Sequence, residues 1–297
     1  MRKVLRRLRP KRVLLENLEQ SGLEDVVVID GIPVKEVKFL GMSRLGNLSW
    51  KGKFDGLPIK IFEAFNNDHA RTVADIMQLE DLQDLFPKFY HRKDKYLIVE
   101  WVDGLPVENL MTNQSKKHIQ QIFWLQHRIH HSLSTISQPY SFNYYEYLVS
   151  RYIKFVGPFD HGNVQFLRSI SQPGADFPLC ENRLFHLDIT PQNLVLHKGQ
   201  MKVIDNELLG FGIYYPFDYF NSYHAIKRYP WADEYLRLIR EHEMDLLRWI
   251  LDCKELFMNL WNLRMIGSSI QSGHRFSSLL RSSESPLSHP IFEFLEK

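Results

Sequence analysis

The chain has few cysteines, no long apolar run and almost no net charge, and each shortage excludes a class of protein. Its 297 residues include two cysteines, which excludes a disulfide-stabilised scaffold and favours a reducing compartment. No apolar stretch in the sequence approaches the ~20 residues that cross a bilayer as a helix. The formal net charge of +2 gives no global field that would favour nucleic acid as a partner, and we expect none.

The N-terminus lacks the apolar core of a secretory signal and is strongly basic instead. Seven lysines and arginines fall within residues 1–12, with no acidic residue among them. Near anionic lipid each such charge contributes about 1 kcal/mol of attraction. The alternative, which we favour, is a solvated tail or helix. We therefore expect a cytoplasmic protein, with a peripheral position at the inner face of a membrane as the second possibility.

The order of predicted elements divides the chain into a basic segment over 1–24, a strand-rich part over 25–102 and a helical part over 103–297. β-Branched and alternating apolar residues, several ending at Asp-Gly, predict the strands. Apolar residues at helical spacing predict the helices. The expected strands cover 26–29, 34–40, 48–54, 59–62 and 95–102, and the expected helices cover 68–80, 115–135, 142–156 and 232–266.

The densest polar motif lies in the segment 184–213, which interrupts the predicted helices. Asp188 is followed five residues later by Asn193, and Asp205 comes after an apolar hairpin that would bring it beside Asn193. Phosphoryl transfer needs a carboxylate that orients the acceptor hydroxyl and accepts its proton, and oxygen ligands that hold Mg²⁺ against the triphosphate. The spacing predicts Asp188 as the catalytic base and Asn193 and Asp205 as metal ligands.

The motif resembles a known family. His-x-Asp-x4-Asn from His186, followed by Ile204-Asp205-Asn206-Glu207, is similar to the protein-kinase-like superfamily, and most similar to its small-molecule branch of choline and ethanolamine kinases and aminoglycoside phosphotransferases. The stretch 210–221 resembles that branch too. The Asp-Phe-Gly and Ala-Pro-Glu motifs of protein kinases are absent from the sequence. The resemblance covers residues 35 to 225.

The resemblance implies an α+β, two-lobed fold, with a small β-rich N-lobe, a larger helical C-lobe, and ATP and magnesium between them. Lys60 occupies the place of the lysine that clamps the phosphates, and a lysine inside an apolar strand requires an anionic partner. That acid should come from the predicted helix 68–80, where both Asp75 and Glu80 are candidates.

The remaining site assignments also follow from the resemblance. Gly41 and Gly46 lie where a glycine-bearing loop would cover the phosphates, and the backbones of Glu100 and Val102 would meet adenine near the hinge. His186 would pack and hydrogen-bond beside the catalytic loop rather than act as an acid or base. Asp218 would steady that loop as a structural acceptor rather than bind metal.

The predicted function is ATP- and Mg-dependent transfer of the γ-phosphoryl group to a hydroxyl. The acceptor stays open among a small alcohol, an amino alcohol, an aminoglycoside-like sugar and a lipid-linked sugar. The alternatives are a non-catalytic nucleotide-binding pseudokinase scaffold and an atypical protein kinase.

Two other patterns permit a ligand site, and for both we favour a structural interpretation. His127, His130 and His131 have helical spacing, but no acid or cysteine near them in the sequence completes a metal site, so a solvated helix face is expected. A set of C-terminal aromatic residues could form a cage for a quaternary ammonium, but aromatics at this spacing usually form core. They are Trp231, Tyr235, Trp249, Phe257 and Trp261.

Overall fold

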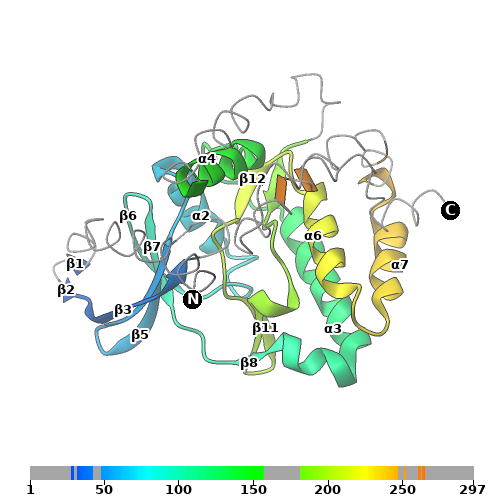
Figure 1. Ribbon diagram of the computed structural model, residues 1–297, viewed down its shortest axis with the longest axis horizontal. Coiled ribbons are helices and arrows are strands. Elements are labelled where there is room, and N and C mark those ends of the chain that lie inside the picture. The colour runs from blue at the N-terminus through cyan, green and yellow to red at the C-terminus, as the bar shows by residue number, and fades with distance from the viewer. Residues whose placement is uncertain are drawn as a thin grey trace, which may run out of the picture.

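The computed structural model places a β-sheet at one end of the molecule and a group of helices at the other (Figure 1). The predicted basic run 1–12, Gly46, Trp249 and Phe257 lie outside the residues that the structure describes. Those described are 28–29, 32–42, 48–156, 181–246, 251, 260–261 and 263–264.

The N-lobe is built on a five-stranded antiparallel sheet. Its strands, in spatial order, are β3 (Lys35–Met42), β4 (Leu48–Phe54), β5 (Leu57–Glu63), β7 (Tyr96–Glu100) and β6 (Phe89–Lys93). Asp55 and Gly56 form the two-residue turn between β4 and β5, with φ of 49° and 77°. Asp-Gly favours this turn because both residues tolerate positive φ. The strands predicted over 34–40, 48–54 and 59–62 are thereby confirmed.

The alternation of β5 decides which side chains face the rest of the molecule. Ile59 and Ile61 belong to a small cluster with Trp50 on one face of the sheet. Phe62, one residue on, belongs to the large core that continues into the helices. Because successive side chains of a strand point to opposite faces, Lys60 shares the face of Phe62 and is directed toward the C-lobe.

One helix, α2 (Asn67–Met77), packs against the sheet and agrees with the helix predicted over 68–80. Asn66 caps it, since its side-chain oxygen accepts a 2.8 Å hydrogen bond from the backbone N–H of His69. The apolar side of α2 is fully buried at Val73 and Ile76, which joins the sheet and the helical lobe in one core.

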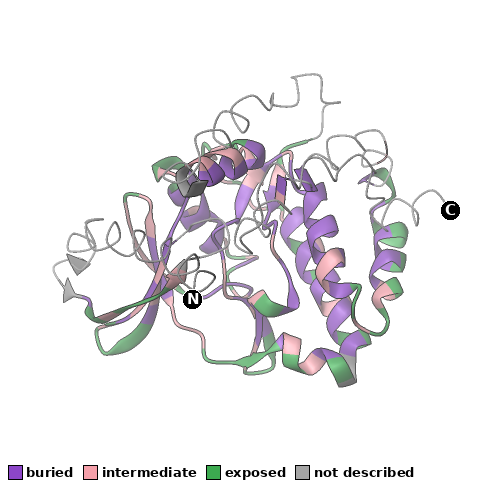
Figure 2. Cartoon of the chain, in the orientation of Figure 1, coloured by how far each residue is buried: buried purple, intermediate pink, exposed green. Residues whose placement is uncertain are grey.

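The C-lobe combines long helices with three short strand pairings. Its buried residues concentrate along the helices, as Figure 2 shows in purple. The helices are α3 (Val107–His130), α4 (Tyr144–Val156), η2 (Pro191–Asn193), α6 (Pro216–Ile226) and α7 (Ala232–His242). The short strands are β8 (Leu105–Pro106), β9 (Arg183–Phe185), β10 (Leu194–His197), β11 (Gln200–Val203) and β12 (Gly210–Gly212), and a separate pair is β1 (Val28–Ile29) with β2 (Ile32–Pro33).

Two helix predictions need correction. Helix α3 begins at Val107, directly after Pro106, and not at residue 115. Val107 and Met111 are buried one turn apart, but polar residues around them obscure the period. The continuous helix predicted over 232–266 is wrong, because Glu243 (φ −133°, ψ 39°) interrupts it after α7.

The C-terminal aromatic residues that the structure describes are mainly core. Tyr235 and Trp261 are buried, whereas Trp231 is 62% exposed. Tyr235 and Trp261 therefore follow the expectation of core packing, and that expectation is wrong for Trp231. Among the described helices, none has the length and hydropathy of a membrane span.

A buried histidine joins α2 to the C-lobe. His69 Nδ1 accepts a hydrogen bond from the Phe65 N–H at 3.2 Å, so the neutral ring carries its proton on Nε2, which donates to the carbonyl of Leu209 at 2.8 Å. The ring also stacks on Phe142, with 4.2 Å between centroids. Protonation at Nδ1 would place a second donor against the Phe65 N–H.

This arrangement predicts a loss of stability in acid. Burial lowers the pKa of His69 from 6.5 to about 4. The unfolded chain then binds a proton between these pH values while the folded chain does not, so the free energy of unfolding falls as the pH drops from 6.5 toward 4. We expect a loss of roughly 3 kcal/mol relative to a His69→Gln variant, measured by urea unfolding at each pH. Parallel pH profiles for the two proteins would contradict this assignment.

Candidate active site

The predicted catalytic loop lies between β9 and β10, and side chains of α6 hold its backbone. Asn221 donates to the carbonyl of Leu187 at 2.7 Å, and Ser222 donates to the carbonyl of Ile189 at 2.6 Å. Leu187 has a φ of 57°, a left-handed conformation that is uncommon for leucine. The contacts from α6 fix this conformation, which sets the direction of the Asp188 side chain that follows.

The carboxylate of Asp218, also on α6, is the central support of the loop. It is fully buried, and its Oδ2 accepts the backbone N–H of His186 at 2.8 Å. The same oxygen lies 2.9 Å from Nε2 of His130 on α3. Asp218 therefore has the structural role expected of it. The expectation of a solvated face is wrong for His130, which is 4% exposed.

His186 is a packed, neutral side chain. It is fully buried, and its Nε2 lies 3.0 Å from Oδ1 of Asn206, the residue that follows Asp205. Burial lowers the pKa of His186, although Asp218 and Asp188 act in the opposite direction. The ring therefore connects the loop to the segment after β11, which agrees with its predicted packing role.

The hairpin β10–β11 brings the two predicted metal ligands to its open end. Leu194 pairs with Val203, and beyond them the N–H of Ile204 donates to the carbonyl of Asn193 at 2.9 Å. The side-chain amide of Asn193 donates to the carbonyl of Asp188 at 3.0 Å, which directs its nitrogen to the loop. Its Oδ1 is then the atom suited to bind a cation, next to the strand end that carries Asp205.

Lys60 reaches this point from the N-lobe. Its Nζ lies 3.0 Å from Oδ1 of Asp205 and 3.0 Å from the carbonyl oxygen of Ile204. The side chain of Lys60 is 16% exposed and that of Asp205 is 32% exposed. The pair joins residues 145 positions apart and connects the two lobes through their opposite charges.

The expected partners of Lys60 were Asp75 and Glu80, and the structure pairs it with Asp205 instead. Glu80 is exposed and lies beyond the end of α2. Burial raises the pKa of Asp75, while Arg71 and Arg92 oppose that shift. The positive charges that act on Asp75 are thus those of Arg71 and Arg92, and Lys60 is not among them.

Arg264 is a site residue that the sequence did not indicate. Its Nη2 lies 2.7 Å from Oδ1 of Asp188, and its Nη1 donates to the hydroxyl of Tyr144 at 2.7 Å. Burial disfavours the guanidinium charge, but Tyr144 and Asp188 together raise the pKa of Arg264 above its ordinary value. A permanent positive charge therefore holds the carboxylate of the predicted base from the C-terminal side of the chain.

The residues predicted to surround the nucleotide lie along the N-lobe. Gly41 is in β3 with a φ of 158°, and a Cβ there would meet no atom within 4 Å. Glu100 ends β7, and its N–H donates to the carbonyl of Lys88 at 2.8 Å. Val102 follows in the connection to β8. Their predicted roles with ATP stay predictions.

The support of the loop by Asp218 can be tested by Asp218→Asn. The variant keeps the shape but loses the charge, and its amide places a buried NH2 group at one of the two oxygen positions. We expect a loss of about 3 kcal/mol in the free energy of unfolding, the scale for breaking a buried ion pair or hydrogen-bond network. Urea unfolding measures this, with Asp94→Asn as control, since Asp94 lies in an exposed turn. Equal stability of the two variants would show that Asp218 is not the support.

The chain matches no protein-family model and no curated protein, but it matches solved structures. The amicoumacin kinase hAmiN, in complex with AMP-PNP, Ca²⁺ and Ami, aligns over 96% of this chain and 94% of its own, with 12% identity and a TM-score of 0.53. LicA in complex with AMP aligns over 92% and 95%, with 14% identity and a TM-score of 0.52. Choline kinase LicA from Streptococcus pneumoniae aligns over 95% and 99%, with 15% identity and a TM-score of 0.50. The chain therefore has the two-lobed protein-kinase-like fold, in the form that these small-molecule kinases share.

Proposed function

We propose that this protein is an ATP- and Mg-dependent phosphotransferase that moves the γ-phosphoryl group to a hydroxyl of a small-molecule acceptor. The observation that carries the proposal is the contact between Lys60 and Asp205 across the two lobes, beside the loop with Asp188 and Asn193. An ammonium, an amide and two carboxylates thus lie close together. This is the set of groups that phosphoryl transfer requires.

The metal would be held by Asn193 and Asp205. An amide oxygen and a carboxylate are hard oxygen ligands, and their strand ends are joined by the hydrogen bond from Ile204 to Asn193. Held by these two residues, the ion would supply positive charge against the phosphates of ATP. Lys60 would then exchange part of its contact with Asp205 for the phosphates, because its ammonium lies at the end of the hairpin that carries Asp205.

Asp188 would orient the acceptor hydroxyl and accept its proton as the phosphoryl group is transferred. Its place is fixed twice, by the α6 contacts to the loop backbone and by Arg264 at Oδ1. Arg264 would keep the carboxylate in position, which a proton acceptor needs. Tyr144 in turn holds the guanidinium.

The proposed acceptor is a small molecule with a hydroxyl group. The solved structures with this fold are named as a choline kinase and an amicoumacin kinase. The analogy with choline kinase supports an amino alcohol as acceptor, while another small alcohol, an aminoglycoside-like sugar and a lipid-linked sugar stay open.

The base is tested by Asp188→Asn, which preserves shape and removes the charge. Phosphotransfer to a matched acceptor, found by screening ATP consumption against a hydroxyl panel, should fall by at least ~100-fold. Affinity for ATP should change little, because the phosphate contacts come from other residues. Turnover by the variant at the wild-type rate would remove Asp188 from this role, and an absence of acceptor-dependent turnover in the wild type would favour a scaffold.

The nucleotide contacts are tested by calorimetric titration with AMP-PNP in the presence and absence of Mg²⁺. Lys60→Ala should weaken binding by about 10-fold or more, equivalent to ~1.4 kcal/mol, and Asp205→Ala should abolish the enhancement by Mg²⁺. Lys53→Ala is the control, since that lysine is exposed on the neighbouring strand and pairs with Glu36. Unchanged affinity in both site variants would contradict the assignment.

A further inference from the structure

A cluster of two histidines and one glutamate lies where the end of α3 meets the end of α7. His127 and His131 are one turn apart, and their rings stack with 4.2 Å between centroids. Nε2 of His131 lies 3.0 Å from Oε1 of Glu243, and Nε2 of His127 lies 3.9 Å from the same oxygen. No acidic residue lies near these histidines in the sequence. The fold brings Glu243 beside them, 112 residues after His131.

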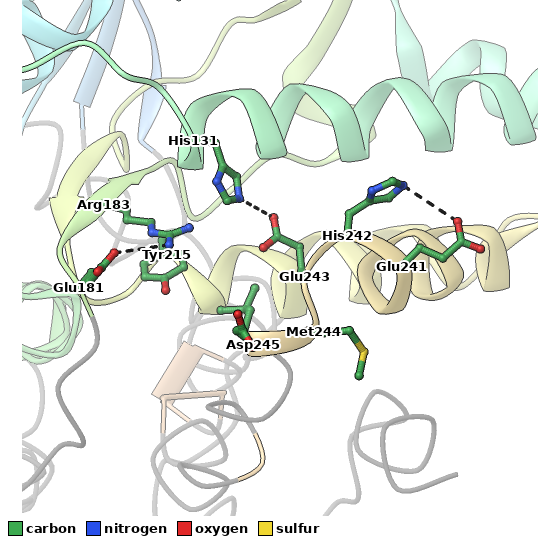
Figure 3. A pocket seen from close by; sticks show the side chains of 10 residues that line it. His131, Glu181, Arg183, Tyr215, Glu241, His242, Glu243, Met244 and Asp245 are labelled. Atoms are coloured by element: carbon green, nitrogen blue, oxygen red, sulfur yellow. Dashed lines mark hydrogen bonds and ion pairs between the residues drawn. The ribbon is translucent and has the colours of Figure 1, made fainter.

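The interruption after α7 is what directs Glu243 to this place. Its backbone departs from the helix at φ −133° and ψ 39°, while its N–H still bonds to the carbonyl of Ile239. In Figure 3 the side chains of His131 and Glu243 point toward each other, whereas His242 is turned toward Glu241. A continuous helix would have placed residue 243 elsewhere around the axis of α7.

We propose that His127, His131 and Glu243 bind a Zn²⁺ ion. Ligand atoms at the ~2.0–2.1 Å bond lengths of tetrahedral zinc lie about 3.3 Å apart, and the two distances to Oε1 fall on either side of that value. Two imidazoles and a carboxylate are an established zinc ligand set, while Mg²⁺ takes oxygen ligands.

The surroundings leave room for the remaining coordination position. His131 and Glu243 line a surface pocket of about 430 Å³. Their side chains are 37% and 6% exposed, and that of His127 is 27% exposed, so an ion can enter without unfolding the helices. Water from the pocket would complete a tetrahedron, as in zinc sites with three protein ligands.

An outer contact orients the carboxylate. The buried hydroxyl of Tyr219 donates to Oε1 of Glu243 at 2.7 Å, and it lies 3.1 Å from Nδ1 of His130. His130 in turn contacts Asp218, the support of the catalytic loop. Such outer partners fix metal ligands and contribute to affinity. The ion would thus join α3 to α7 at a place already connected to Asp218, apart from the proposed magnesium site.

The test is a zinc titration of the full chain after treatment with a chelator, read out by competition with a chromophoric chelator. The wild type should bind one Zn²⁺ per chain at this site, and Co²⁺ in its place should show tetrahedral visible absorption. His127→Gln and His131→Gln should each lower zinc affinity by more than ~100-fold, and Tyr219→Phe by about 10-fold, the scale of an outer partner. Zinc should raise the melting temperature of the wild type but not that of the histidine variants.

Two controls locate the ion. His242→Gln changes a histidine that neighbours the cluster but faces Glu241, and it should bind zinc as the wild type does. Asp205→Asn should also retain zinc, because that residue belongs to the active site. Failure of the wild type to bind zinc stoichiometrically, wild-type affinity in both folded histidine variants, or loss of the ion in Asp205→Asn would each overturn the proposal.

Discussion

The arrangement of the C-lobe depends on the hydrogen bonds that the buried carboxylate of Asp218 accepts. A carboxylate without water is costly unless it is hydrogen-bonded, and here one oxygen serves both the backbone of His186 and the ring of His130. The first contact fixes the loop that carries Asp188, and the second fixes α3 against α6. The proposed catalytic loop is therefore held by contacts to α6, in the core of the lobe.

The register of β5 determines the contact between the two lobes at Lys60 and Asp205. Lys60 faces Asp205 because it is an even number of positions from Phe62, whose side chain enters the common core. A slip of one residue in β5 would turn Lys60 to the opposite face and direct an apolar side chain to Asp205. The burial of Ile59 and Ile61 on the other face opposes that slip, so apolar packing determines where the charge of Lys60 lies.

Local motifs were predictable, and contacts between distant segments were not. Asp188, Asn193 and Asp205 lie close together in the sequence, and a hairpin with a Lys-Gly turn was sufficient to join them. The acid that pairs with Lys60 was sought on the next helix, although it comes from the other lobe. Arg264 belongs to no motif in the sequence, so its contact with Asp188 could not be predicted. The end of α7 before Glu243 could not be predicted from the sequence. No glycine or proline occurs over 232–266, and the helical spacing of apolar residues continues through Glu243.

A crystal structure of the full chain with AMP-PNP and Mg²⁺ tests the central claim most directly. The account predicts Mg²⁺ bound at ~2.1 Å to Asn193 Oδ1 and an Asp205 oxygen, with Nζ of Lys60 on the phosphates and the γ-phosphate facing Asp188. Nucleotide bound with its phosphates away from Lys60, or metal held by neither Asn193 nor Asp205, would contradict it.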